Sequence, residues 1–384
     1  MSKLEELIEK LCPNGVEYKK LDEVCNFNRG TSMTSKNAIE GDVPVISGGQ
    51  KPAFYHNVSN RPAGTITIAG SGAYAGYVAF WDKPIFCADS FSVDVKDDKI
   101  LDKKFLCYYL LNKQQDIYNK KNGAGIAHVH GKDIAKFNIP VPPLEVQCEI
   151  VHILDDFTLL SAELSAELKA RREQFNYYRD KEMLNAKNVV KYKLNEIAKI
   201  YDGTHQTPKY TDSGIDFISV ENIKDIYNSK KYISIEDYNK YKIKPKLNDI
   251  FMTRIGTIGK CTVFNKQKDL AYYVSLALIR PNNDIVDSYY LKYLIESIIG
   301  IKELRKRTLI NAVPIKINKD DIGKLVLPIP PLEEQKRIVN ILDRFDKLCN
   351  DISEGLPAEI EARQKQYEYY RDKLLTFKEL KVNE

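Results

Sequence analysis

An internal repeat constrains the fold of this chain more than any other feature. Residues 139–160 (IPVPPLEVQCEIVHILDDFTLL) and 327–348 (LPIPPLEEQKRIVNILDRFDKL) match at a constant offset of 188 residues. Further on, 173–181 (EQFNYYRDK) and 365–373 (KQYEYYRDK) match at an offset of 192, because four residues are inserted in the second copy. Self-similarity at a fixed period indicates one structural unit that occurs twice.

Each copy predicts a long helix that starts after a double proline, a residue pair that cannot continue into a helix interior. Apolar residues then alternate spacings of four and three, which is the heptad pattern of a coiled-coil seam. We expect the packing and partner-facing positions to be Gln147, Ile150, Leu154, Phe157, Leu164, Leu168, Phe175, Gln335, Ile338, Leu342, Phe345, Ile352, Ile360 and Tyr367. The two helices either pair as one coiled coil or pack separately, each on its own domain.

The second copy departs from the heptad pattern between Ile352 and Ile360, where two spacings of four follow each other. Such a stutter locally unwinds a coiled coil. Gly355 and Pro357 lie inside it. We therefore expect this helix to be loosened or kinked there.

The segments that precede the helices also resemble each other. YKKLDEVCNFNRGT (18–31) is similar to YKLNEIAKIYDGT (192–204), and both segments contain short runs of β-branched and aromatic residues bounded by turn residues. Such runs predict strands, and one helix is expected near 103–119 with a counterpart near 288–305. The fold class is therefore α/β (α+β), with β-rich heads.

The predicted order is head, helix, head, helix, with boundaries at 1–143, 144–189, 190–331 and 332–384. Charge is spread unevenly over these parts. Residues 1–143 carry a net charge of +2, residues 190–330 carry +8 and the remaining stretches carry −5. A basic surface favours phosphate binding, although +8 is also compatible with solubility alone.

Composition excludes several classes of protein. The seven cysteines include no CxxC pair, which predicts reduced thiols in the cytoplasm. No apolar run approaches the roughly 20 residues that span a bilayer, so no membrane partner is expected. The chain has neither a GxxxxGK[ST] phosphate loop nor an [ND]PP[YF] tetrapeptide of amino-methyltransferases.

Three further motifs have structural interpretations. GSGAYA (70–75) fits the dinucleotide pattern G-x-G-x-x-A, but the following YVAFWDKP predicts a strand, so we expect a hairpin turn. His128 and His130 have no further ligand at supporting spacing, so no metal site is expected. The tyrosine pairs at 177–178 and 369–370 are expected to pack in the helix seam, and base stacking is the alternative.

The motif I-P-x-P-P-L-x-x-Q occurs before a long helix at 139–147 and again at 327–335, where leucine takes the first position. It is accompanied by G-T-I-G-K at 256–260 and by the loops at 123–134 and 308–322. On these residues the whole chain resembles the specificity subunits of type I restriction–modification systems. The resemblance implies two target recognition domains, 1–143 and 190–331, that each read one half of a split site in double-stranded DNA. It also implies antiparallel spacer helices.

The resemblance further implies that the helices dock two modification (methyltransferase) subunits, and that a restriction/translocase subunit completes the complex. S-adenosylmethionine, ATP and magnesium are then expected in those partners, with no cofactor and no catalytic activity in this chain. Helices of about 40 residues would span roughly 60 Å and set the distance between the half-sites.

Base reading uses fork-like donors on groove-facing loops, and phosphates are bound by Lys, Ser, Thr and backbone amides. Loop residues of these types are candidate DNA contacts: Arg29, Thr31, Gln50, Lys51, Arg61, Ser71, Tyr74, Lys121, His128 and His130 in the first head, and Thr204, His205, Gln206, Lys209, Arg254, Thr257, Lys260, Arg305, Arg307 and Asn311 in the second. Two other functions stay open: a coiled-coil interaction scaffold whose heads bind peptide or carbohydrate, and a self-sufficient methyltransferase.

Overall fold

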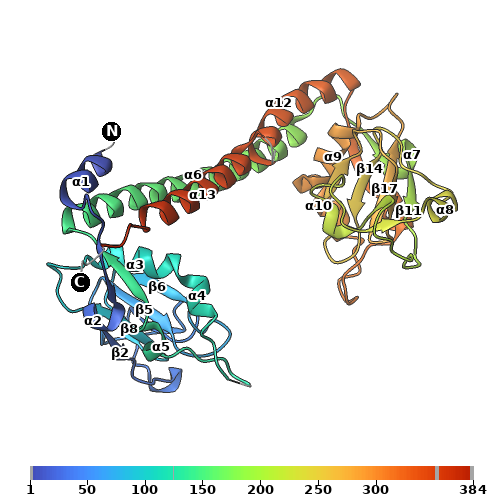
Figure 1. Ribbon diagram of the computed structural model, residues 1–384. Helices are drawn as coiled ribbons and strands as arrows, with labels where there is room; N and C mark the ends of the chain where they lie inside the picture. The colour runs from blue at the N-terminus through green and yellow to red at the C-terminus, as the bar shows by residue number, and fades with distance from the viewer. Residues whose placement is uncertain (1–2, 124, 351–353, 381–384) are drawn as a thin grey trace. The chain divides into compact units, whose positions relative to one another are not determined.

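The computed structural model describes residues 3–123, 125–350 and 354–380 (Figure 1). The chain divides into two compact units. One unit holds the described residues of 1–164 and 360–384, and the other holds those of 165–359. Each unit therefore contains one head with the parts of the long helices nearest to it.

The first head is built on a four-stranded sheet of order β2-β8-β5-β6, a three-stranded sheet of order β4-β3-β7 and a β1-β9 pair. Its strands are β1 (Glu17–Lys20), β2 (Cys25–Arg29), β3 (Val43–Ile46), β4 (Phe54–His56), β5 (Thr65–Ala69), β6 (Val78–Trp81), β7 (Phe86–Cys87), β8 (Ser90–Val95) and β9 (Asn138–Val141). Its helices are α1 (Lys3–Leu11), α2 (Leu21–Val24), η1 (Ser35–Asn37), α3 (Lys103–Asn112), α4 (Gln114–Tyr118) and α5 (Gly131–Ile134). Only β3 and β7 pair in parallel among these strands.

The second head repeats this topology strand for strand, with sheets β11-β17-β14-β15 and β13-β12-β16 and a β10-β18 pair. Its strands are β10 (Val190–Lys193), β11 (Ala198–Asp202), β12 (Ile215–Ile218), β13 (Tyr232–Ile233), β14 (Ile250–Thr253), β15 (Cys261–Val263), β16 (Leu270–Tyr272), β17 (Leu276–Pro281) and β18 (Val326–Ile329). Its helices are α7 (Leu194–Ile197), η2 (Val220–Asn222), α8 (Ile235–Asn239), α9 (Ser288–Glu296), α10 (Ile298–Arg305) and α11 (Lys319–Gly323). The faint similarity between the heads is thus a true structural repeat, and the predicted α+β class is confirmed.

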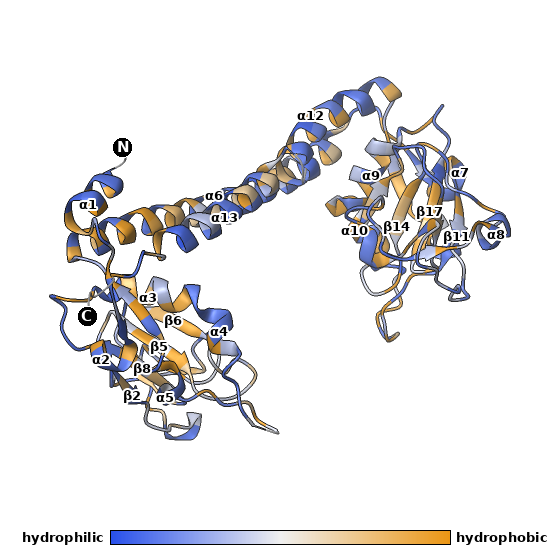
Figure 2. Ribbon diagram, viewed as in Figure 1, coloured by the Kyte–Doolittle hydropathy of each residue, from blue (hydrophilic) through white to orange (hydrophobic). Residues whose placement is uncertain are grey.

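Both cores lie between a sheet and a helix. The central strands β5 and β14 are buried at every position, and in Figure 2 the apolar colour is clear on central strands such as β14, whereas other strands are paler. Phe105 and Leu106 of α3 complete one core, and Tyr290 and Leu291 of α9 complete the other. Apolar burial of this kind is the main stabilising term of such a domain.

The prediction of one helix per head near 103–119 and 288–305 is wrong, because each stretch forms two helices. In the second head the break falls at Ser297, whose backbone is extended (φ −73°, ψ 169°). The Ser297 hydroxyl accepts from the Ile299 amide at 3.2 Å, so it caps a new helix. In the first head α3 ends at Asn112, and the next residue, Lys113, lies outside the helical region (φ −86°, ψ 10°).

The long helices pack against each other in opposite directions. They are α6 (Leu144–Asn185), α12 (Leu332–Asn350) and α13 (Leu356–Leu374). In the second unit, Glu182 of α6 binds Arg337 of α12 at 2.7 Å, whereas Arg172 donates to the Cys349 carbonyl at 3.4 Å. From the first contact to the second, the residue number on α6 falls while that on α12 rises, so the two helices are antiparallel.

Two aromatic stacks involve corresponding residues of the two repeat copies. Phe157 stacks on Tyr370 (centroids 5.7 Å apart, planes at 25°), and Phe345 stacks on Tyr178 (5.4 Å, 24°). Phe157 corresponds to Phe345 in the repeat, and Tyr178 corresponds to Tyr370. The phenylalanine of each copy therefore packs on the tyrosine of the other, and the predicted antiparallel pairing of internally repeated helices is confirmed.

The second copy of the long helix is interrupted. Helix α12 ends at Asn350 and α13 begins at Leu356, with Glu354 and Gly355 outside both helices. This is where the four-residue insertion lies in the sequence. Ile352, which was expected in the seam, falls outside the described residues.

Both heads are joined to their helices by a buried glutamine. The Gln147 side chain accepts from the Asp102 amide at 2.8 Å and donates to the carbonyls of Ile100 (2.8 Å) and Pro142 (2.7 Å). Gln335 makes the same three bonds, accepting from Asp287 N at 2.8 Å and donating to the carbonyls of Ile285 (2.9 Å) and Pro330 (2.8 Å). Both side chains are completely buried. They therefore offer no surface to a partner protein. Instead of the partner contact expected for them, they join each head to its own helix.

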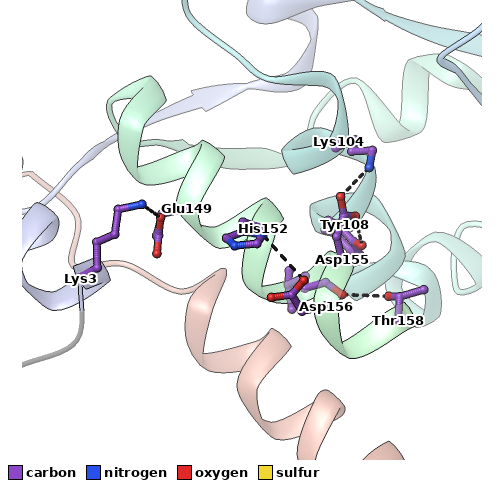
Figure 3. A network of polar contacts seen from close by, with 9 residues as sticks. Lys3, Lys104, Tyr108, Glu149, His152, Asp155, Asp156 and Thr158 are labelled. Atoms are coloured by element: carbon purple, nitrogen blue, oxygen red, sulfur yellow. Dashed lines mark hydrogen bonds and ion pairs between the residues drawn. The ribbon is translucent and has the colours of Figure 1, made fainter. Parts of the chain in front are cut away.

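A second set of polar contacts lies beside this junction in the first unit (Figure 3). Asp155 of α6 binds Lys104 at 2.5 Å and accepts from the Tyr108 hydroxyl at 2.7 Å, both on α3. Lys3 of α1 pairs with Glu149 of α6. These contacts hold α1 and α3 against the start of α6.

The second unit has an equivalent and more buried cluster. The Tyr293 hydroxyl donates to Asp343 at 2.6 Å, and Lys292 binds Asp346 at 2.7 Å. Burial raises the pKa of the Asp346 carboxyl, but the Lys292 ammonium outweighs burial and leaves that pKa below its usual value. The head and α12 are thus joined by a charged pair as well as by Gln335.

Candidate nucleic-acid interface

The predicted contact loops of the first head gather at one edge of its sheets, where β2, β3 and β5 end and β8 begins. Thr31 N donates to the Cys87 carbonyl at 3.0 Å, and the Ser90 hydroxyl donates to the Ser47 carbonyl at 2.8 Å. The turn after β5 is bound to the loop before α5, because Gly72 N donates to the Ala127 carbonyl at 3.0 Å. We call this edge of each head its reading edge.

The reading edge of the second head is assembled by matching bonds. Thr204 N donates to the Tyr272 carbonyl at 3.1 Å, and Gly256 N donates to the Ile315 carbonyl at 2.8 Å. Gly72 and Gly256 both have positive φ (+86° and +77°), a conformation that L side chains rarely adopt. The turn at 70–76 joins the antiparallel strands β5 and β6 without opening a helix, so the hairpin interpretation of GSGAYA is confirmed.

The two reading edges differ in charge at matching positions. Arg29 ends β2 and Asp202 ends β11, while Gly70 follows β5 where Arg254 follows β14. Arg254 is 6% exposed, forms an ion pair with Asp202, and its Nε has no hydrogen-bond partner within the described chain. In the first head Arg29 is exposed, and Gly70 stands at the position that corresponds to Arg254. The same framework therefore presents an exposed guanidinium in one head and a neutralised one in the other.

Most of the predicted contact residues lie on exposed or half-exposed loop surface. At the reading edges these are Arg29, Thr31, Gln50, Lys51, Ser71, Tyr74, His128 and His130 in the first head, and Thr204, His205, Gln206, Lys209, Thr257 and Asn311 in the second. Lys260 is exposed where β15 begins, and Arg305 is exposed at the end of α10. Exposure makes these side chains available, and their contacts with DNA stay predictions.

Four of the predicted residues are instead engaged inside their own head. Arg61 donates to the Ser92 hydroxyl at 2.9 Å and to nearby backbone carbonyls. Arg307 binds the Glu303 carboxylate at 2.8 Å, and the Lys121 ammonium lies 4.3 Å from the centre of the Tyr118 ring. With Arg254 buried as well, these side chains support the loops, and we no longer expect them to read bases.

His128 and His130 lie in the loop before α5 with parallel rings, 6.2 Å between centroids. Backbone bridges join His128 to Ser71 and Asn122, so the pair belongs to the reading edge. Within residues 3–123, 125–350 and 354–380, no group of three or more His, Cys, Asp or Glu side chains is arranged to hold a metal ion.

The second head has a cleft of about 560 Å³ beside its reading edge. Lys209 and Gln206 line one side of the cleft, and Lys240 and Lys242 line the other. These last two lysines were missed from the sequence. Their signal was the alternation of lysines in YNKYKIKPK (238–246), a segment without a counterpart in the first head.

Six of the seven cysteines are buried and all seven are free. Burial raises the pKa of the Cys25 thiol to about 12 and that of the Cys87 thiol to about 11, so both are protonated at neutral pH. This agrees with their interpretation as small core residues. No helix in the described part of the chain has the length and apolarity to cross a membrane.

Comparison with known families identifies the family that has this repeated architecture. The family model described as "Type I restriction modification DNA specificity domain" matches residues 13–171 and again 186–362. The chain therefore belongs to the type I restriction–modification specificity subunits, a class whose task is DNA target recognition.

Individual relatives agree over nearly the full length. The chain is 31% identical to the EcoR124I/EcoR124II specificity subunit of Escherichia coli, an alignment that covers 98% of this chain and 97% of that one. The solved S subunit of a Mycoplasma genitalium type I system superimposes with a TM-score of 0.61 at 16% identity, covering 94% and 96% of the two chains. A chain from a structure of type I R-M complex assembly gives a TM-score of 0.57 at 19% identity, covering 95% and 98%. These structures show the same fold.

Proposed function

We propose that the two heads read the two halves of a bipartite target in double-stranded DNA. The observation that carries this proposal is the duplicated reading edge, built twice from the same strand ends and bearing different side chains at matching positions. Two similar frameworks with different chemistry are suited to two different half-sites. Readers made of two identical protomers obtain their two half-sites by symmetry, whereas this chain carries both readers itself.

The long helices set the spacing between the half-sites and dock two methyltransferase subunits. The support is the antiparallel pairing in each unit, together with the buried glutamine and charged contacts that fix each head to its helix. The relative in the E. coli restriction enzyme bears the name specificity subunit. In this scheme methylation and cleavage reside in partner subunits, which also hold S-adenosylmethionine, ATP and magnesium, and the complex works in the cytoplasm.

Methylome mapping tests the proposal directly. Cells that express the chain with its cognate modification subunits should methylate a site of two defined blocks separated by a fixed unspecified spacer. Replacement of residues 190–330 by the corresponding head of another family member should change one block and leave the other unchanged. A single uninterrupted target, or a change in both blocks after the exchange, would refute the two-head mechanism.

The alternative of heads that bind peptide or carbohydrate differs in its response to salt. Binding to DNA phosphates releases counterions, so the affinity for duplex DNA should fall steeply as salt rises. A self-sufficient methyltransferase would bind S-adenosylmethionine as the isolated chain. Calorimetry with the purified chain and S-adenosylmethionine should detect no binding.

A further inference from the structure

The second head contains an arm that the first head lacks. The connection from β4 to β5 runs over residues 57–64, whereas the corresponding connection from β13 to β14 runs over 234–249. The longer connection holds α8 and the lysines of 240–246, and we call residues 234–246 the lysine arm. The lysine arm therefore adds four lysines and two carboxylates to this head, a net charge of +2 that the shorter connection of the first head does not match.

The lysine arm is held firmly against the head. Its Tyr238 is 4% exposed, and the Tyr238 hydroxyl donates to Asp269 at 2.9 Å. Near the other end, Arg280 donates to the Lys244 carbonyl at 3.0 Å. Tyr241 of the arm and Thr204 of the reading edge line the same cleft. An arm fixed at several points presents its lysines at defined positions.

The cleft between the arm and the 204–209 loop has a net positive charge. It is lined by two carboxylates, and each is already paired within the head: Asp202 with Arg254, and Asp237 with Lys240 at 2.6 Å. Lys209 and Lys242 line the same cleft and have no ion-pair partner among the described residues.

A buried polar group also borders the cleft. Tyr272 lines it, is 2% exposed, and its hydroxyl has no hydrogen-bond partner among the residues that the structure describes. Buried hydroxyls are normally hydrogen-bonded, and an unsatisfied one beside a cleft indicates a bound water or ligand oxygen there. Two unpaired ammonium groups and a hydroxyl donor suit the oxygens of a phosphate group.

We propose that the lysine arm and the 204–209 loop form a clamp for the DNA sugar–phosphate backbone, which makes the second head the main sequence-independent anchor of the protein. The inference rests on the proposed DNA-reading function and adds an asymmetry to it. The first head has a net charge of +2 and no such arm, so its half-site is held with fewer phosphate contacts. The second head tightens binding to any duplex, cognate or not.

The test is the salt dependence of duplex binding by the full chain assembled with its modification subunits. Lys209→Ala/Lys242→Ala removes both unpaired lysines of the cleft. The matched control is Lys191→Ala/Lys199→Ala, which removes the same charge from exposed positions of β10 and of the start of β11, the end opposite the reading edge. Thermal unfolding of all three proteins checks that both variants are folded.

Each lost phosphate contact lowers the slope of log Kd against log salt by about 0.9. The cleft variant should therefore lose about 1.8 from the slope, so that between 50 and 200 mM salt the wild type loses about tenfold more affinity than the variant. The effect should be equal on cognate and unrelated duplexes, and the methylated sequence should not change.

Three results would overturn the clamp while leaving the proposed function intact: an unchanged slope, an equal loss of slope in the control variant, or an altered target sequence in the cleft variant. The last result would mean that the cleft reads bases. A wild-type complex that binds duplex DNA without any salt dependence would instead refute the proposed function itself.

Discussion

Removal of the buried glutamine at a head–helix junction should strongly destabilise the unit that contains it. Gln335 is 0% exposed and serves three backbone groups, the Asp287 amide and the carbonyls of Ile285 and Pro330. Gln335→Ala leaves all three without their partner. A net hydrogen bond contributes about 1 kcal/mol, and each buried group left unsatisfied costs about 1–3 kcal/mol.

Some of these groups would regain a partner as water enters the space, so we expect a total loss of about 3–5 kcal/mol. Gln335→Leu separates the two causes, because leucine fills most of the volume and supplies none of the hydrogen bonds. We therefore expect the leucine variant to lose most of the stability that the alanine variant loses. Gln364→Ala, at an exposed helix position, should change stability by less than about 0.5 kcal/mol.

Urea unfolding measures these differences, and hydrogen exchange followed by mass spectrometry locates them. Gln335→Leu should reduce protection in the second unit, whereas Gln147→Leu should reduce it in the first. The reasoning would be refuted by a Gln335→Leu protein as stable as the wild type. It would also be refuted by equal loss of protection in both units from either substitution.

Three further outcomes follow from the contacts described above. Tyr178→Ala and Phe345→Ala, measured singly and together by urea unfolding, should show a coupling of about 0.5–1.5 kcal/mol because their rings stack, and additive effects would contradict that stack. Asp346 has a pKa below its usual value through Lys292, so its contribution to stability is present above about pH 4 and is lost as pH falls through the lower folded pKa. The stability difference between the wild type and Asp346→Asn should therefore shrink in that acidic range, and a difference independent of pH would contradict the assignment. Arg29→Ala should weaken binding to the cognate duplex by about 1–3 kcal/mol and relax only one half-site in methylome mapping, while an equal loss on every sequence would mean that Arg29 contacts phosphate.

The architecture could be predicted because the internal sequence repeat marks its two equivalent halves. The matched positions 139–160 and 327–348 predicted two equivalent helices, and the head segments before them predicted two similar domains. The break at Ser297 was not predicted, since the apolar spacing of YYLKYLIESIIG continues across it and only the local capping by the serine hydroxyl ends one helix and begins the next. Periodicity reports which face is buried, and it is insensitive to such a break.

The reading edge was only partly predictable from the sequence. Loop position and residue type identified exposed side chains such as Arg29 and Gln206. The same two criteria do not show which arginines form contacts within their own head. Arg254 directly follows a strand, as a contact residue would, but it is buried and paired with Asp202, which lies 52 residues away in the sequence. Lys240 and Lys242 reach the cleft only because the arm folds back against the 204–209 loop.

The side chains at the head–helix junctions are constrained by buried hydrogen bonds, whereas exposed side chains at the reading edges are not. Gln147 and Gln335 make the same three hydrogen bonds in both heads, because each must satisfy buried backbone groups whose geometry the fold sets. At the reading edges the backbone bonds also match, yet Arg29 and Asp202 occupy the same strand end with opposite charge. An exposed side chain there, such as Arg29, can change without leaving a buried group unsatisfied, since the loops are held by backbone hydrogen bonds, whereas Asp202 is tied to the buried Arg254. The physical consequence is that an exposed reading-edge side chain such as Arg29 can change with little effect on the stability of its own head.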